Sequence, residues 1–187
     1  MEPFPVDECL SPLSGKFQKF DSSIHLILNQ VHPDLELSKE SYPIINQIIN
    51  YLIKLISINE NLNFEQLDNI IYNEFPKEYA YRIIHLHSVN YNGLSKIQVK
   101  KAMKLIAVVP KNKGVMVFIT ILCEYIIGNI LDLAGNYVLN NKKIRIKPKH
   151  ILIAIITDND LDKIFHKVIP VKFSIIIPDI KNLKLNI

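Results

Sequence analysis

Apolar residues recur along most of this chain at intervals of three and four, the spacing that places side chains on one face of an α-helix. Eight helices are expected, at about residues 21–30, 38–56, 64–73, 77–89, 95–106, 115–140, 148–156 and 158–167. Leu35–Leu37 alternates briefly, and the chain after 167 is apolar without a helical period. The predicted fold class is therefore all-α, with a short extended loop.

The predicted helices form two similar sets, each with a long helix between shorter ones. The long helix at 38–56 has apolar positions on more than one face, so it needs cover from other helices. Crossing the two long helices would bury both. The residues Tyr91-Asn92-Gly93 are typical of a turn and separate the two sets of helices. The domains expected are a short flexible tail at 1–19, helical units at 20–92 and 93–168, and an extended tail at 169–187.

The composition favours a folded protein with a large core, because 49% of the 187 residues are apolar. No uninterrupted apolar run reaches the roughly 18 to 20 residues of a membrane span, and polar residues interrupt the longest stretch, 115–139. No secretory signal is visible at the start. Cys9 and Cys123 lie far apart, so two free thiols in a reducing compartment are expected.

Charge is divided unevenly between the two halves. Residues 1–92 hold 6 basic and 12 acidic residues, whereas residues 93–187 hold 16 basic and 6 acidic ones. This asymmetry indicates that the second half meets a polyanion. The alternative is that the two halves attract each other.

The residue groupings that enzymes and metal sites require are not found in the sequence. It contains no Gly-rich phosphate loop, nucleophile motif or paired-carboxylate context. His85 and His87 lack a second ligand pair at zinc-like spacing. Cys123 falls on an apolar helix, where core packing is its expected role. The protein is therefore predicted not to be an enzyme, with no metal, cofactor or small-molecule substrate.

The tripeptide His32-Pro33-Asp34 follows the first predicted helix and occurs in two kinds of protein. J-domain co-chaperones carry it after a strongly basic helix, and one core histone carries it in its first loop. The preceding residues here, "SSIHLILNQV", contain no Lys or Arg. A histone-type loop is therefore favoured, in which Pro33 ends the helix and Ser38 caps the next one.

Longer stretches carry the same resemblance. In the second half, "EYIIGNILDLAGN" (Glu124–Asn136), "NNKKIRIKPKHILIAI" (Asn140–Ile155), "DNDLDKIFHKV" (Asp158–Val168) and "IIPDI" (Ile176–Ile180) resemble histone H-two-A. In the first half, "QVHPD" (Gln30–Asp34), "IINQIINYLIKLIS" (Ile44–Ser57) and "FPKEYAYR" (Phe75–Arg82) resemble histone H-two-B. This order resembles the histone doublets of large nucleocytoplasmic DNA viruses. The resemblance implies two tandem histone folds that form an intramolecular handshake pseudo-heterodimer.

The resemblance also implies a DNA-binding surface that contacts phosphates and reads no bases. Arg145 matches the family's arginine that enters the minor groove, where its fixed planar charge is well suited. The other DNA-contact candidates lie in the loops and on the first helix of the second half, with two more at the first loop of the first half: Lys142, Lys143, Lys147, Lys100, Lys101, Lys104, Lys111, Lys113, Ser38 and Lys39. A solvated basic face is the alternative for each lysine.

Two further surfaces follow from the resemblance. The family's acidic partner-binding patch is matched by Glu78, Glu124, Asp132, Asp158 and Asp160. Leu86, Asn129 and Asn159 stand at other patch positions and weaken it; an ordinary acidic face is the alternative. The tail residues Ile176, Ile177, Pro178 and Ile180 match a segment that docks on the H-three/H-four pair, with burial on the chain's own core as the alternative.

The first half departs from the family between Ser57 and Leu62, where it is about ten residues shorter and offers no cation. Fewer DNA contacts are therefore expected on this half.

The function implied by the resemblance is that of a structural chromatin protein, which wraps and compacts double-stranded DNA in nucleosome-like particles with a second histone pair resembling H-three/H-four. The alternative is a histone-fold interaction module in a transcription or chromatin assembly. The resemblance places the protein in a virion, and in the host nucleus or a cytoplasmic virus factory, and implies no membrane partner.

Overall fold

The computed structural model describes residues 18–88 and 93–165, which are mostly helical. Two strands of two residues each are the only β-structure in these ranges. The elements are α1 (Asp21–Val31), β1 (Glu36–Leu37), α2 (Ser41–Ile56), α3 (Phe64–Glu74), α4 (Lys77–Ile84), the 3-10 turn η1 (His85–Ser88), α5 (Lys96–Ile106), α6 (Lys113–Asn140), β2 (Arg145–Ile146), α7 (Pro148–Thr157) and α8 (Asn159–Phe165).

Short polar side chains determine where several helices begin. The side chain of Asn63 accepts a bond from the backbone of Gln66, and the Gln66 side chain accepts one from Asn63, which starts α3. Asn112 caps α6, which therefore begins at Lys113, two residues before the start that the apolar pattern predicts at Val115. The prediction that Ser38 caps α2 is wrong. That helix begins at Ser41, and the Ser38 hydroxyl bonds to the hydroxyl of Ser41 at 3.0 Å.

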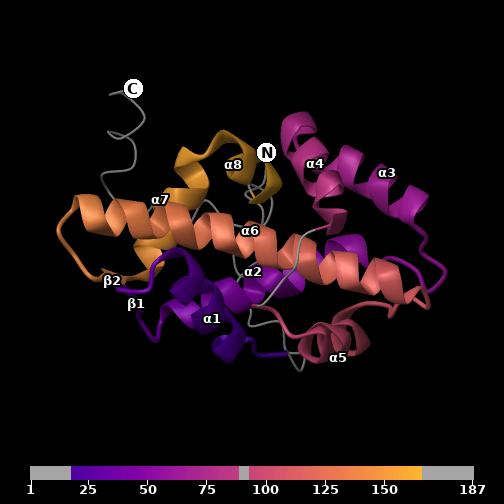
Figure 1. The fold of residues 1–187 in the computed structure, drawn as a ribbon, viewed down its shortest axis with the longest axis horizontal. Helices are drawn as coiled ribbons and strands as arrows, with labels where there is room; N and C mark the ends of the chain where they lie inside the picture. Colours follow the sequence, from indigo (N-terminus) through magenta and orange to yellow (C-terminus); the bar gives the residue numbers. More distant parts are fainter. Residues whose placement is uncertain (1–17, 89–92, 166–187) are drawn as a thin grey trace, which may run out of the picture.

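Helix α6 crosses the middle of the molecule, with α1, α2, α5 and α7 packed against it (Figure 1). Its buried residues run from Val115 to Val138 and cover more than one face. It is the one helix among the described residues that is long and apolar enough to cross a membrane by length and composition alone. The polar residues within α6 do not lower its mean hydropathy below that of a helix apolar enough to cross a membrane. Most of it is buried inside the fold, as in the core helix of a globular domain.

Loops from the two halves meet in pairs at opposite ends of α6 (Figure 1). At the first junction, residues 32–40 lie beside residues 141–147, and β1 pairs in parallel with β2, so that Glu36 lies opposite Arg145. At the second junction, residues 57–63 lie beside residues 107–112, where the Lys111 amide donates to the Glu60 carbonyl at 2.7 Å. Each junction therefore joins a loop of one half to a loop of the other.

His32 connects the first half to α6. Its ring nitrogen Nε2 lies 3.0 Å from the carbonyl oxygen of Asp132 and 3.4 Å from a carboxylate oxygen of the same residue. The ring lies against Gly135, where a β-carbon would overlap it. The absence of a side chain at Gly135 thus allows the first loop to approach the long helix.

We expect Gly135→Ala to destabilise the protein by about 1–3 kcal/mol, because the added methyl group overlaps the ring of His32. Gly128→Ala is the matched control on the same helix, since its β-carbon would meet only Ile27, at 3.9 Å. That control should be neutral or stabilising by up to about 1 kcal/mol through helix propensity. Urea unfolding of both variants measures the difference. Equal stabilities would contradict the proposed close packing at Gly135.

Candidate nucleic-acid interface

The loop after α6 presents a group of exposed cations. The amides of Lys142 and Lys143 bond to the carbonyls of Leu139 and Val138, at 2.8 and 3.0 Å, and this closes the helix end. Lys142 adopts the left-handed conformation, with φ of 53°, that commonly terminates helices. The chain then enters β2, where alternate side chains point to opposite sides. The loop cations with exposed side chains are Lys142, Lys143, Arg145 and Lys147.

Arg145 and Ile146 show how β2 orients this loop. Ile146 is fully buried in the core, whereas 58% of the Arg145 side chain is exposed. The burial of one residue therefore fixes the outward direction of the other. The Arg145 guanidinium is not isolated, since its Nη2 and Nε donate to Oε2 of Glu36 at 2.6 and 3.0 Å.

Ser38 and Lys39 differ in accessibility at the same junction. Ser38 is 8% exposed, and its hydroxyl contacts Ser41 inside the junction. The Ser41 hydroxyl in turn donates to the carbonyl of Ile146 at 3.3 Å. Lys39 is exposed. Of the two candidates, Lys39 is the one whose side chain is placed to meet a ligand.

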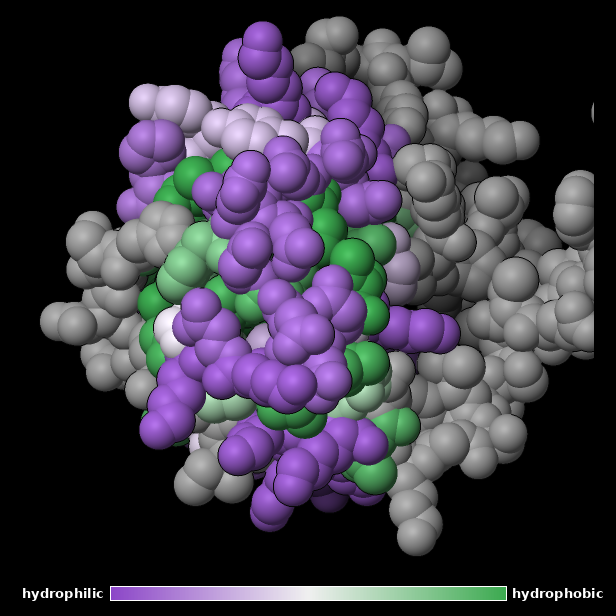
Figure 2. All heavy atoms as spheres, turned by 90° about the vertical axis from the view of Figure 1, so that its right-hand side faces the viewer, coloured by the Kyte–Doolittle hydropathy of each residue, from purple (hydrophilic) through white to green (hydrophobic). Residues whose placement is uncertain are grey.

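Of the two cations expected in the first loop of the second half, Lys111 lies in the second junction and Lys113 is the first residue of α6. Lys111 and Lys113 are both exposed. The Lys111 ammonium lies 3.2 Å from a carboxylate oxygen of Glu60 and 3.3 Å from the amide oxygen of Asn61. Figure 2 shows this end of the molecule, where hydrophilic side chains project across an apolar layer. Ile58 and Val108 are exposed apolar residues of the two loops.

Helix α5 carries three of the predicted phosphate contacts on its outer face. Val99, Ala102 and Met103 are buried, and the intervening lysines point away from them. The exposed lysines are Lys100, Lys101 and Lys104. This helix leads directly into the second junction, so its lysines and Lys111 belong to one continuous segment.

The sequence reasoning missed Lys149, which belongs to this surface, and the buried His150, which supports the backbone beside it. Lys149 is exposed in the first turn of α7, directly after the predicted basic loop. His150 is 1% exposed, and its Nδ1 accepts a bond from the backbone amide of Lys147 at 3.1 Å. Burial, assisted by the charges of Lys149, Lys143 and Lys147, lowers the pKa of His150 to about 4. The run of lysines was the available signal, but the predicted helix start at Pro148 separated Lys149 from it.

Most of the predicted acidic patch is engaged in contacts within the chain. Both carboxylate oxygens of Glu124 accept backbone amides, from Gly93 at 3.1 Å and Leu94 at 3.0 Å. Asp132 lies beside His32, and Glu78 is exposed. Near these residues a cavity of about 350 Å³ lies between α1, η1 and α6. Leu86 and Asn129 contribute to its lining.

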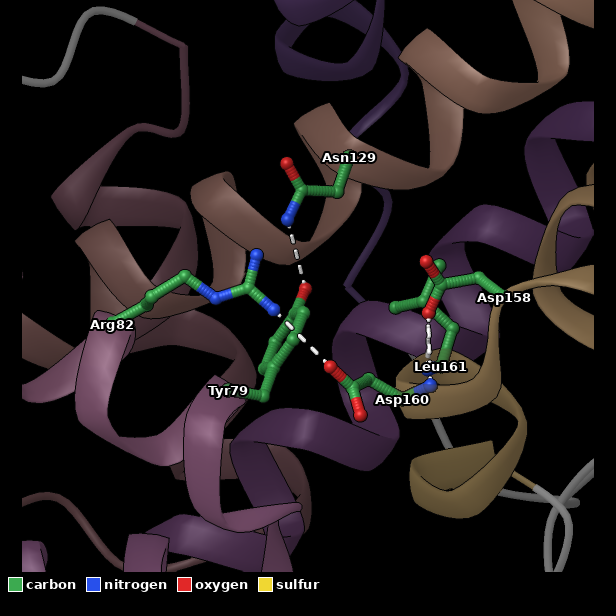
Figure 3. A network of polar contacts seen from close by, with 6 residues as sticks. All are labelled: Tyr79, Arg82, Asn129, Asp158, Asp160 and Leu161. Atoms are coloured by element: carbon green, nitrogen blue, oxygen red, sulfur yellow. Dashed lines mark hydrogen bonds and ion pairs between the residues drawn. The ribbon is translucent and has the colours of Figure 1, made fainter.

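The remaining patch residues lie around Tyr79 (Figure 3). Arg82 pairs with Asp160 at 3.1 Å and lies over the Tyr79 ring, 5.1 Å from its centre. The Tyr79 hydroxyl accepts a bond from the Asn129 amide at 2.9 Å, and burial raises the pKa of this tyrosine. Asp158 accepts the amides of Asp160 and Leu161, which starts α8. These carboxylates therefore have structural partners in the chain itself.

Other predicted groups are separated from this surface. Cys123 is fully buried in α6, as expected for core packing, and burial raises its pKa to about 12. Within residues 18–88 and 93–165, no three His, Cys, Asp or Glu side chains gather as metal ligands would. The predicted docking residues Ile176, Ile177, Pro178 and Ile180 lie outside the described residues.

Comparison with known proteins finds similarity to histone H-two-A over part of the chain. One histone H-two-A of Tetrahymena pyriformis is 45% identical to this chain over 51 residues, which are 27% of this chain and 38% of that protein. The H-two-A histones of Kluyveromyces lactis and Saccharomyces cerevisiae are each 44% identical over 55 residues, 29% of this chain and 42% of theirs.

The matched region spans about two fifths of the length of these curated relatives. No protein-family model matches the chain. The similarity to histone H-two-A, together with the mostly helical structure, supports a histone fold.

We expect acid to destabilise the protein partly through His150. Its pKa of about 4 in the folded protein lies below the ordinary 6.5, so the unfolded chain binds the proton more readily. The free energy of unfolding that the lowered pKa contributes is fully present above pH 6.5 and is lost as the pH falls toward 4. This loss amounts to about 3 kcal/mol at most. His150→Gln keeps an acceptor for the Lys147 amide but does not titrate. Urea unfolding from pH 7 to pH 4 should show a smaller loss for the variant; parallel curves would contradict the assignment.

Proposed function

We propose that this protein is a structural chromatin protein that binds double-stranded DNA through its phosphates. The observation that carries the proposal is the exposed basic loop containing Lys142, Lys143, Arg145 and Lys147, held outward by the buried Ile146. The partial identity to histone H-two-A supports the same role. Cations held on a rigid loop neutralise phosphates without reading base sequence.

The two halves act, in this proposal, as an intramolecular equivalent of the dimer that histones H-two-B and H-two-A form. The paired loops at both ends of α6 support it, as does the placement of ion pairs. The ion pairs between Arg82 and Asp160, Lys111 and Glu60, and Arg145 and Glu36 each join the first half to the second. Fusion in one chain replaces bimolecular pairing by an intramolecular contact and so removes its dependence on concentration.

The proposal extends to partners and location. The chain joins a second histone pair resembling H-three/H-four, through the tail around Ile176–Ile180, and wraps DNA in nucleosome-like particles. The order of the two resemblances, H-two-B before H-two-A, supports a large DNA virus as its source. It would then act in the virion, and in the host nucleus or a cytoplasmic virus factory.

A second candidate function is a histone-fold interaction module in a transcription or chromatin assembly. Two observations favour it. Arg145 and Lys111, one cation from each junction, are each paired with a carboxylate of the first half. The first half itself presents few exposed cations near its loops, with Lys39 as the clearest. Such a module would dock on proteins with little wrapping of DNA.

Nuclease protection distinguishes the two candidates. The tagged chain is recovered from its source cells, and the associated DNA is digested with micrococcal nuclease. Packaging predicts a discrete protected fragment, up to about 146 bp as for a full histone octamer, together with a second histone pair. Stoichiometric non-histone partners without protected DNA would support the interaction module instead.

We expect replacement of Lys142, Lys143 and Arg145 by Ala to abolish most of the protection, because it removes three of the exposed cations of the first junction. The matched control replaces three exposed lysines on α2, α4 and α8, which lie outside both junctions: Lys54, Lys77 and Lys163. The control removes the same charge and should retain most protection. Equal loss in both variants would show that net charge, rather than this loop, holds the DNA.

A further inference from the structure

Both loop junctions show the same arrangement of charge, with a carboxylate of the first half against a cation of the second half. Glu36 meets Arg145 at the first junction, and Glu60 meets Lys111 at the second. We propose that Glu36 and Glu60 compete with DNA phosphates for these two cations and thereby limit the affinity for DNA. This inference rests on the proposed function and assigns to these carboxylates a role in tuning it.

Backbone pairing holds the first of these ion pairs in place. Glu36 and Arg145 are partners in the β1–β2 ladder, and the Glu36 amide donates to the carbonyl of Ile144 at 2.9 Å. Both guanidinium bonds, at 2.6 and 3.0 Å, go to the same carboxylate oxygen. The carboxylate is therefore presented to Arg145 by the register of the loops, and its effective concentration there is high.

The second junction reaches the same result with different residues. The Lys111 amide donates to the carbonyl of Glu60 at 2.7 Å, which places the two side chains side by side. The ammonium then lies 3.2 Å from the Glu60 carboxylate. Because the two junctions lie at opposite ends of α6 and share no residue, the repetition is two independent observations.

Solvent exposure makes these pairs replaceable rather than permanent. The side chains of Arg145 and Glu36 are 58% and 59% exposed, and those of Lys111 and Glu60 are 66% and 57% exposed. Exposed ion pairs are weak, so a phosphate can displace the carboxylate. The displaced carboxylate remains within a Debye length of about 10 Å and repels the same phosphate. Each cation therefore binds DNA less strongly than an unpaired one.

The competition has a measurable signature in salt dependence. The logarithm of the DNA-binding constant falls with the logarithm of salt concentration, by about 0.9 for each phosphate neutralised. If Glu36 and Glu60 keep their cations off phosphate in part of the bound complexes, their neutralisation adds up to two phosphate contacts to the average complex. The slope should then become steeper by up to about 1.8, and affinity at 0.1 M salt should rise roughly tenfold or more.

The test uses the full chain with Glu36→Gln and Glu60→Gln together, titrated with a fluorescent 30-base-pair duplex at several salt concentrations. Glu74→Gln is the control, since it removes an exposed carboxylate for which no ion pair is recorded among the described residues. It should change the slope little. In a chain that also carries Arg145→Ala and Lys111→Ala, the gain from the two glutamine substitutions should disappear. Thermal unfolding verifies that each variant is folded.

The outcomes separate the two proposals. Wild-type binding with the normal salt dependence, but the same slope and affinity in the double glutamine variant as in the Glu74→Gln control, overturns the competition alone. A gain that persists without Arg145 and Lys111 overturns it as well, because the carboxylates would then act through general repulsion. If neither the wild type nor the double variant binds the duplex, DNA binding itself fails and the competition fails with it.

Discussion

The need to bury more than one face of α6 is the constraint on which the rest of this structure depends. A helix of 28 residues that buries apolar side chains on more than one face cannot be covered by the short helices of one half. Helices α1 and α2 cover it from the first half, while α5 and α7 cover it from the second. Separation of the halves would expose this surface to water, so the two sets of helices are held together chiefly by hydrophobic burial.

The pairing of the loops accompanies this packing and creates the charged surface. With α2 packed against α6, the loop at each end of one half meets a loop of the other. The first half is acidic and the second is basic, so the junctions bring unlike charges together. The unequal charge of the two halves, which favours a polyanionic partner, thus also produces ion pairs within the chain. A ligand for Arg145 or Lys111 has to replace a carboxylate that already binds there.

Helix positions were predicted closely because they depend on near neighbours in the sequence. The predicted limits of α3, α5 and α7 lie within one residue of those found. The start of α2 differs because Ser38 bonds to Ser41 in place of capping the helix. The predicted fourth helix changes into a 3-10 turn after Ile84. The exposure of the basic loop could also be anticipated. Neighbouring residues of a strand point to opposite sides, so Arg145 points outward because the apolar Ile146 points into the core.

The sequence by itself determined the helices, their apolar faces and the cations of the loops, because those properties depend on residues within about four positions of each other. The tertiary structure alone decided which groups those cations meet. Arg145 and Glu36 are 109 residues apart, and their contact depends on the register that the packed helices impose on β1 and β2. The approach of His32 to Gly135 and the internal bonds of Glu124 were decided in the same way. No local pattern specifies such contacts, since each depends on how the whole core packs around α6.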